Sequence, residues 1–124
     1  MVSKLDAKRR VVNAMTAVYE PYAIKNREQS DILWHNISWS EEDQSGFFLV
    51  RFAPGGSSTP HEHLGMEEFV VLDGEFEDCD GRVYRTGDCV SLSAGSRHYS
   101  HSKEGCTVAV FVRGGFKSVE KHEV

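Results

Sequence analysis

The chain has 124 residues, of which 40% are hydrophobic and 27% charged, and its formal net charge is −5. This length and composition predict a single globular domain, residues 1–124, with a core large enough to fold without disulfide bonds. The negative charge argues against nucleic acid as a partner, because proteins that bind a phosphate backbone usually present a basic face.

The sequence has no features of a secretion signal or a membrane anchor. Charged residues interrupt the first 20 positions, and no apolar run is long enough to cross a bilayer. The three cysteines, Cys79, Cys89 and Cys106, include no C-x-x-C pair, so they indicate neither a disulfide framework nor a cysteine zinc site. We therefore expect a cytoplasmic protein with no membrane partner.

The first predicted element is a helix. Residues 4–18 (KLDAKRRVVNAMTAV) place apolar side chains near the spacing of an amphipathic helix. Pro21 cannot continue such a helix. The pattern predicts a short N-terminal α-helix, which forms an extension of about residues 4–20.

The remainder of the chain consists of short segments rich in β-forming residues, with turn signals such as Asp-Gly and Thr-Gly-Asp between them. These segments are residues 32–39, 46–53, 67–72, 75–79, 82–85, 89–93 and 106–112. Many short strands with no helical segments between them are typical of an antiparallel sandwich or barrel. We therefore expect an all-β barrel of about eight strands over about residues 31–118.

Residues 59–74 (TPHEHLGMEEFVVLDG) place two histidines and two glutamates against an apolar run. Because alternate side chains of a strand share a face, His61 and His63 are expected to point the same way. If the strand continues, Glu67 shares that face and Glu68 takes the other. The Leu-Gly-Met loop can break this parity, so the spacing leaves both glutamates open.

A second pair of histidines, His98 and His101, follows in the stretch AGSRHYSH. Three positions apart, they lie on opposite faces of a strand, so normally only one of them can join a shared site. Two imidazoles from one strand, a carboxylate and a third imidazole form a ligand set for Zn, Fe, Mn or Ni. A metal would also justify burying a carboxylate among Phe and Val. We therefore expect a divalent metal ion as the cofactor.

The spacing of these residues resembles that of the cupins. The first cupin motif runs Gly, five residues, His-x-His, three or four residues, Glu, six residues, Gly. Every one of these spacings is met by Gly55, His61, His63, Glu67 and Gly74. The resemblance implies a double-stranded β-helix, the jelly-roll barrel of the cupins.

The second cupin motif runs Gly, five residues, Pro-x-Gly, two residues, His, three residues, Asn. Gly87, Gly95 and His98 match it, whereas Ser93 replaces the proline and Ser102 replaces the asparagine. Both departures concern turn residues rather than ligands. Together the two motifs carry the resemblance over about residues 46–112.

Within the cupins, the chain resembles the cupin domain of ChrR-type zinc-binding anti-sigma factors and its free-standing relatives. The resemblance implies the metal ligands His61, His63, Glu67 and His98, and so favours Glu67 over Glu68 and His98 over His101. We interpret His101 as a rim or exposed residue. His35 and His122 receive no role.

Two functions follow from the resemblance. The first is a mononuclear non-haem metal dioxygenase, an oxidoreductase that acts on a small organic substrate such as an enolised diketone or a catechol-like group. The alternative is a non-catalytic zinc-binding cupin with a sensing or regulatory role. A complete anti-sigma factor is not expected, because residues 1–45 lack the ligands for the additional zinc domain that such proteins carry.

The strand pattern also suggests which side chains surround the metal. We expect Phe69, Phe111, Val71 and Leu92 to shape a pocket for the small-molecule ligand. Arg51 is a candidate contact for an anionic group. Each of these assignments rests on strand parity alone.

The resemblance further implies a homodimer, because cupins often pair through strand exchange or sheet packing. The candidate interface segments are residues 46–53 and residues 31–40, the latter with Trp34 and Trp39. Ordinary core packing explains the same apolar residues equally well.

Overall fold

The structure is a computed structural model that describes residues 3–22 and 29–124. Its strands are β1 (Glu20–Tyr22), β2 (Gln29–Asn36), β3 (Gly46–Phe52), β4 (Gly56–Ser57), β5 (His61–His63), β6 (Met66–Asp78), β7 (Val83–Arg85), β8 (Cys89–Leu92), β9 (Arg97–His98), β10 (Ser100–Ser102), β11 (Cys106–Arg113) and β12 (Phe116–Ser118). Short 3-10 turns lie at η1 (Asp6–Lys8) and η3 (Lys121–Glu123). In the described ranges, no helix has the length and apolar character to cross a membrane.

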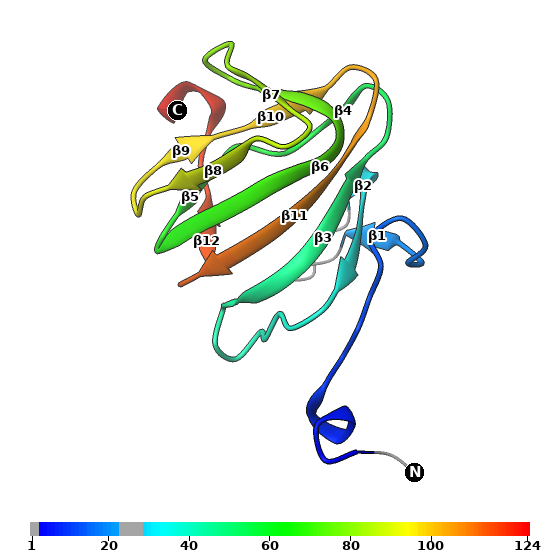
Figure 1. Ribbon diagram of the computed structural model, residues 1–124. Coiled ribbons are helices and arrows are strands. Elements are labelled where there is room, and N and C mark those ends of the chain that lie inside the picture. Colours follow the sequence, from blue (N-terminus) through cyan, green and yellow to red (C-terminus); the bar gives the residue numbers. More distant parts are fainter. Residues whose placement is uncertain (1–2, 23–28) are drawn as a thin grey trace.

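The strands form two antiparallel sheets. The large sheet runs β1-β2-β3-β11-β6-β10-β4, and β7 and β8 also pair with β6. The small sheet has the order β12-β5-β9. Figure 1 shows the large sheet curling, with β5, β9 and β12 together at one side of it. This arrangement confirms the all-β prediction. The described strands outnumber the eight expected, because the structure also has strands of only two residues, such as β4 and β9.

Alternation of side chains along β11 shows how the core is built. In β11, Val108, Val110 and Val112 face the interior and are at most 7% exposed. The intervening residue Phe111 faces the opposite side of the sheet, where it lines an outer groove with Phe47 of β3. The period of two that the sequence displays is therefore the period of burial.

The tryptophans considered as interface residues pack inside the protein. Trp39 is 8% exposed and meets the ring of Phe48 edge to face, with 5.8 Å between ring centroids. Trp34 is half-buried and packs against Tyr22 and Phe48. Core packing therefore accounts for the contacts of both residues, and the homodimer stays a prediction.

The predicted N-terminal α-helix is wrong. The described part of the segment forms only the 3-10 turn η1 and further turns. Its apolar side chains stay in solvent: Val11 is 80% exposed and Val18 is 75% exposed. A helix of this length is marginal unless a surface buries its apolar face, and in the described part of the chain Val11 and Val18 stay exposed. The Asn13 side chain also accepts a hydrogen bond from the backbone N–H of Met15 (2.8 Å), which favours a turn.

Side chains of the barrel hold this N-terminal arm, residues 9–19, in place instead. The guanidinium of Arg51 lies 3.9 Å from the centre of the Tyr19 ring. His35 Nδ1 donates to the carbonyl oxygen of Val18 (2.8 Å). Arg51 therefore faces the outer surface of β3, and the prediction that it contacts an anionic ligand in the pocket is not supported.

Candidate metal site

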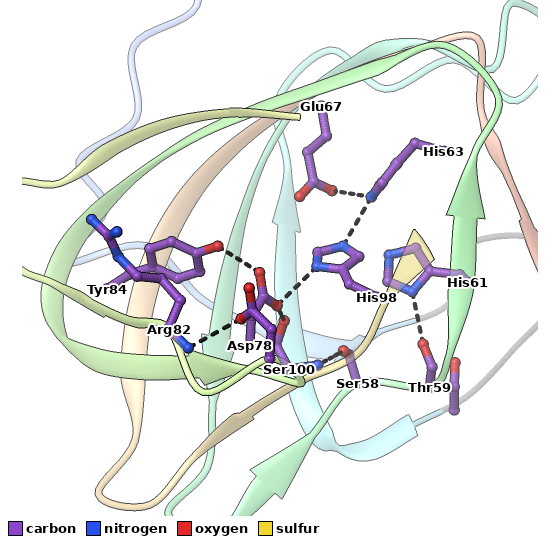
Figure 2. A network of polar contacts seen from close by, with 11 residues as sticks. Ser58, Thr59, His61, His63, Glu67, Asp78, Arg82, Tyr84, His98 and Ser100 are labelled. Atoms are coloured by element: carbon purple, nitrogen blue, oxygen red, sulfur yellow. Dashed lines mark hydrogen bonds and ion pairs between the residues drawn. The ribbon is translucent and has the colours of Figure 1, made fainter. Parts of the chain in front are cut away.

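Four side chains from three strands converge on one point in the interior. His61 and His63 lie on β5, Glu67 on β6 and His98 on β9. Each offers one ligand atom, and these atoms all lie within 4.8 Å of one another. Figure 2 shows the four side chains pointing toward one another. The structure therefore brings together the complete set of residues that the sequence motif singled out.

Strand pairing explains why residues so far apart in sequence meet. His61 is directly opposite His98 in the antiparallel ladder between β5 and β9. Alternation along β5 then places His63 on the same face as His61. Strand pairing thus places three imidazoles on the inner face of the small sheet.

Glu67 reaches the site because the chain changes sheets between β5 and β6. A Cβ atom at Gly65 would lie 1.9 Å from the carbonyl oxygen of Arg113, so only glycine allows this close crossing. After it, Glu67 faces the interior with Phe69, whereas Glu68 is exposed on the outer face. The crossing settles the choice of glutamate that the spacing left open.

The outer nitrogen atoms of two rings are already engaged. His61 Nδ1 donates to the carbonyl oxygen of Thr59 (2.7 Å), and His98 Nδ1 donates to Asp78 Oδ1 (2.8 Å). A neutral imidazole carries one proton, so in each of these rings Nε2 is left with a lone pair. An imidazole in this form is the one that binds a metal ion.

His63 has no such outer partner. Its Nδ1 is buried without a hydrogen-bond partner among the described residues. Its Nε2 lies 3.0 Å from His98 Nε2 and 3.3 Å from Glu67 Oε2. Two nitrogen lone pairs at that distance repel unless a proton or a cation lies between them. Two nitrogens that share a metal at about 2.1 Å and a right angle are also about 3.0 Å apart, so the spacing fits a metal ion.

Burial sets the protonation of the site. It raises the pKa of Glu67 to about 7, because the ionised carboxylate loses its hydration. Burial, followed by the positive charges that His61 and His98 can carry, lowers the pKa of His63 to about 3. The loss of hydration is the largest cause of both shifts. The donor set, the distances and these shifts are consistent with a divalent metal site.

A family model described as the ChrR cupin-like domain matches residues 13–115. The chain belongs to this cupin family. No curated protein matches the chain in the sequence comparison.

Solved structures agree on the fold. An acetylacetone dioxygenase from Acinetobacter johnsonii superimposes with a TM-score of 0.75 at 18% identity, over 92% of this chain and 80% of that one. An RmlC-like cupin protein from Ralstonia eutropha JMP134 gives a TM-score of 0.72 at 16% identity, over 98% of this chain and 73% of that one. The structure of Rhodobacter sphaeroides SigE in complex with the anti-sigma ChrR gives a TM-score of 0.63 at 15% identity, over 81% of this chain and 50% of that one. At such identities the likeness is one of fold.

Asp78 is a member of the site of this cupin that sequence reasoning missed. It lies at the end of β6, is 7% exposed and accepts hydrogen bonds from His98 Nδ1 (2.8 Å), Ser100 Oγ (2.6 Å) and Tyr84 Oη (2.6 Å). Burial alone would raise the pKa of Asp78, but these hydrogen bonds hold it below its ordinary value. The available signal was an acidic residue two positions after Phe76, on the buried face of a strand.

The site opens into a cavity of about 110 Å³ between the two sheets. Most of its wall is apolar, and the described residues that line it include no lysine or arginine. Phe69 lines the cavity as predicted. Val71 and Leu92 pack in or against the core without lining the cavity, and Phe111 is on the other face of the sheet. Those three pocket assignments were therefore wrong.

The remaining candidate side chains lie away from the metal site. His101 is exposed on β10, and its Nδ1 lies 3.0 Å from Ser57 Oγ. His122 is exposed in η3. His35 holds the N-terminal arm, as described above. None of these three histidines belongs to the cluster.

Proposed function

We propose that this cupin binds a divalent metal ion through His61, His63, Glu67 and His98 and acts as a dioxygenase on a small neutral molecule. The convergence of three imidazole nitrogens and one carboxylate at the wall of a small apolar cavity carries this proposal. Four protein ligands leave positions open on a six-coordinate metal such as Fe or Mn.

The size of the cavity bounds the substrate. An engineered cavity of about 150 Å³ holds benzene, and the cavity here is smaller, at about 110 Å³. The substrate is therefore expected to be a small organic molecule.

The side chains that line the cavity also indicate the charge of the substrate. Among the described residues, no lysine or arginine lines the cavity to pair with a free carboxylate or phosphate. Phe69, Val110 and their apolar neighbours exclude water from the space next to the ligands. A neutral molecule that presents two oxygen atoms to the site, such as an enolised β-diketone, matches these properties.

The reaction that we propose is oxidative cleavage of a carbon–carbon bond of the diketone. A diketone R–CO–CH₂–CO–R and O₂ give a carboxylic acid, R–COOH, and an oxo-aldehyde, R–CO–CHO, so O₂ is the oxidant and no reductant is needed. When bound, the metal would supply a Lewis acid and a redox centre for this chemistry. The fold likeness to an acetylacetone dioxygenase supports the proposal.

A second function is favoured by the family match. The model that matches residues 13–115 describes the ChrR cupin-like domain, and the same four ligands can close a tetrahedral zinc site. On zinc, the protein would be a non-catalytic cupin with a sensing or regulatory role. The metal that the site prefers therefore separates the two functions.

Oxygen consumption tests the proposed activity. We expect protein loaded with Fe(II) under anaerobic conditions to consume O₂ when a small β-diketone is added. His61→Ala should abolish this uptake, whereas His122→Ala should retain it. Absence of uptake with every diketone, together with tightly held zinc, would contradict the dioxygenase and support the sensor.

A further inference from the structure

Asp78 is a buried carboxylate that contacts a ring of the metal site from outside the cluster. His61 Nδ1 donates to a backbone carbonyl, and His63 Nδ1 has no partner among the described residues. His98 Nδ1 donates to a carboxylate, that of Asp78. Figure 2 shows this carboxylate on the far side of the His98 ring from His63 and Glu67.

We propose that Asp78 is a positioning residue that fixes the orientation and the tautomer of His98. A carboxylate only accepts hydrogen bonds, so the ring must present Nδ1–H to it and leave the lone pair on Nε2. Nε2 is the atom that faces the other ligands, 3.0 Å from His63 Nε2. The part of this inference that concerns metal binding rests on the proposed function, whereas the tautomer does not.

Two further donors hold the carboxylate itself. Ser100 Oγ shares Oδ1 with His98, and Tyr84 Oη donates to Oδ2. Tyr84 cannot shift easily, because it is 8% exposed and packs against Phe69 and Phe76 at centroid distances of 5.3 and 5.0 Å. The core of the barrel thus fixes Tyr84, Tyr84 and Ser100 fix Asp78, and Asp78 fixes His98.

The charge of Asp78 adds a second role. A divalent ion in a buried site is costly unless negative charge balances it. Glu67 supplies one negative charge as a ligand, and Asp78 supplies another through the His98 ring. Together they would neutralise a divalent ion, although Asp78 does not contact it.

The tautomer can be measured in the metal-free protein by nitrogen NMR of the imidazole rings. At a pH about two units above the ordinary histidine pKa, we expect His98 to show a protonated Nδ1 and an unprotonated Nε2. Asp78→Leu removes the acceptor and keeps the branched shape of the side chain, and it should convert His98 to a mixture or to the Nε2–H form. Asp78→Asn keeps one acceptor oxygen and serves as the milder variant if the leucine variant fails to fold; we expect it to lower the Nδ1–H fraction.

Asp80→Asn is the matched control. Asp80 is exposed, two residues further along, and accepts a hydrogen bond from the backbone N–H of Arg82 (3.1 Å). It should leave the His98 tautomer unchanged. If His98 keeps the Nδ1–H form in both Asp78 variants, the proposed positioning role is wrong.

Zinc affinity, measured by competition with a chelator, tests the consequence for the metal. Loss of the outer partner of a metal-bound histidine typically lowers affinity by about 10–100-fold. We expect a loss in this range for Asp78→Leu, a smaller loss for Asp78→Asn, and a change below about twofold for Asp80→Asn. Unchanged affinity in both Asp78 variants would overturn the role in metal binding. If the wild-type protein binds no metal, the proposed function fails while the tautomer result still decides the positioning role.

Discussion

Glu67 is the residue whose protonation depends most directly on a bound cation. It lies in the interior with Phe69, and burial raises its pKa from 4.5 to about 7. The folded protein without metal therefore keeps a proton on Glu67 at pH values where the unfolded chain has lost it. Metal binding would release that proton and pair the carboxylate.

This shift predicts how the stability of the metal-free protein depends on pH. The contribution of Glu67 is fully present below about pH 4.5 and is lost as the pH rises through about 7, because the folded state holds the extra proton in that window. The free energy of unfolding should therefore fall between roughly pH 5 and pH 8 in the wild type relative to Glu67→Gln. The low pKa of His63 acts in both proteins and largely cancels in the comparison.

Chemical denaturation at several pH values measures this difference. Saturation with a divalent metal should remove the decline, since the ionised carboxylate then has a counter-ion. A stability difference between wild type and Glu67→Gln that is independent of pH would contradict the buried, protonated Glu67.

For individual residues, the sequence predicted the members of the metal site well where their spacing along a strand decides which face they occupy. Alternation placed His61 and His63 on one face, and the motif chose Glu67 and His98 correctly as members of the cluster. Asp78 was missed because its role depends on pairing with a residue 20 positions away. Such pairing follows from sheet topology, which local patterns do not contain.

Among the elements, β6 determines most of the architecture, because it pairs with β7, β8, β10 and β11. It can change partners along its length because Gly74 adopts a φ of +78° and faces β11 closely. A Cβ atom at Gly74 would lie 2.4 Å from the carbonyl oxygen of Gly105. Both the backbone conformation and the space therefore require glycine there.

Gly74→Ala should consequently be strongly destabilising. Gly87 is the matched control: its φ is +93°, but a Cβ atom there would meet nothing within 4 Å. Gly87→Ala carries only the conformational cost, about 1–2 kcal/mol. Gly74→Ala should lose about 1–3 kcal/mol more in the free energy of unfolding, because the backbone of Gly105 has to move. Equal losses in urea denaturation would contradict the close approach.

The N-terminal arm shows why the one helix prediction failed. The apolar spacing of residues 4–18 predicts a helix only if a surface receives its apolar face. Val11 and Val18 instead point into solvent, and the arm is held by Arg51 and His35. The periodicity of the apolar residues therefore could not show whether the fold offers a surface for a helix to pack on.

For the molecule as a whole, strand alternation predicted the all-β architecture, and cupin membership followed from two spaced motifs. The lining of the cavity was predicted less well, because the inner face of β11 consists of Val108, Val110 and Val112 rather than Phe111. In a strand that is apolar on both faces, alternation does not reveal which face is inside. The homodimer stays a prediction.

The central claim is that four side chains hold one metal ion in this cavity. Elemental analysis of protein purified without a metal-affinity column tests it most directly, with His61→Ala, His98→Ala and His122→Ala beside the wild type. We predict near-stoichiometric divalent metal in the wild type and in His122→Ala, and at least a roughly tenfold lower content in the other two variants. Equal metal content in all four proteins, or none in the wild type after exposure to each candidate metal, would contradict the account.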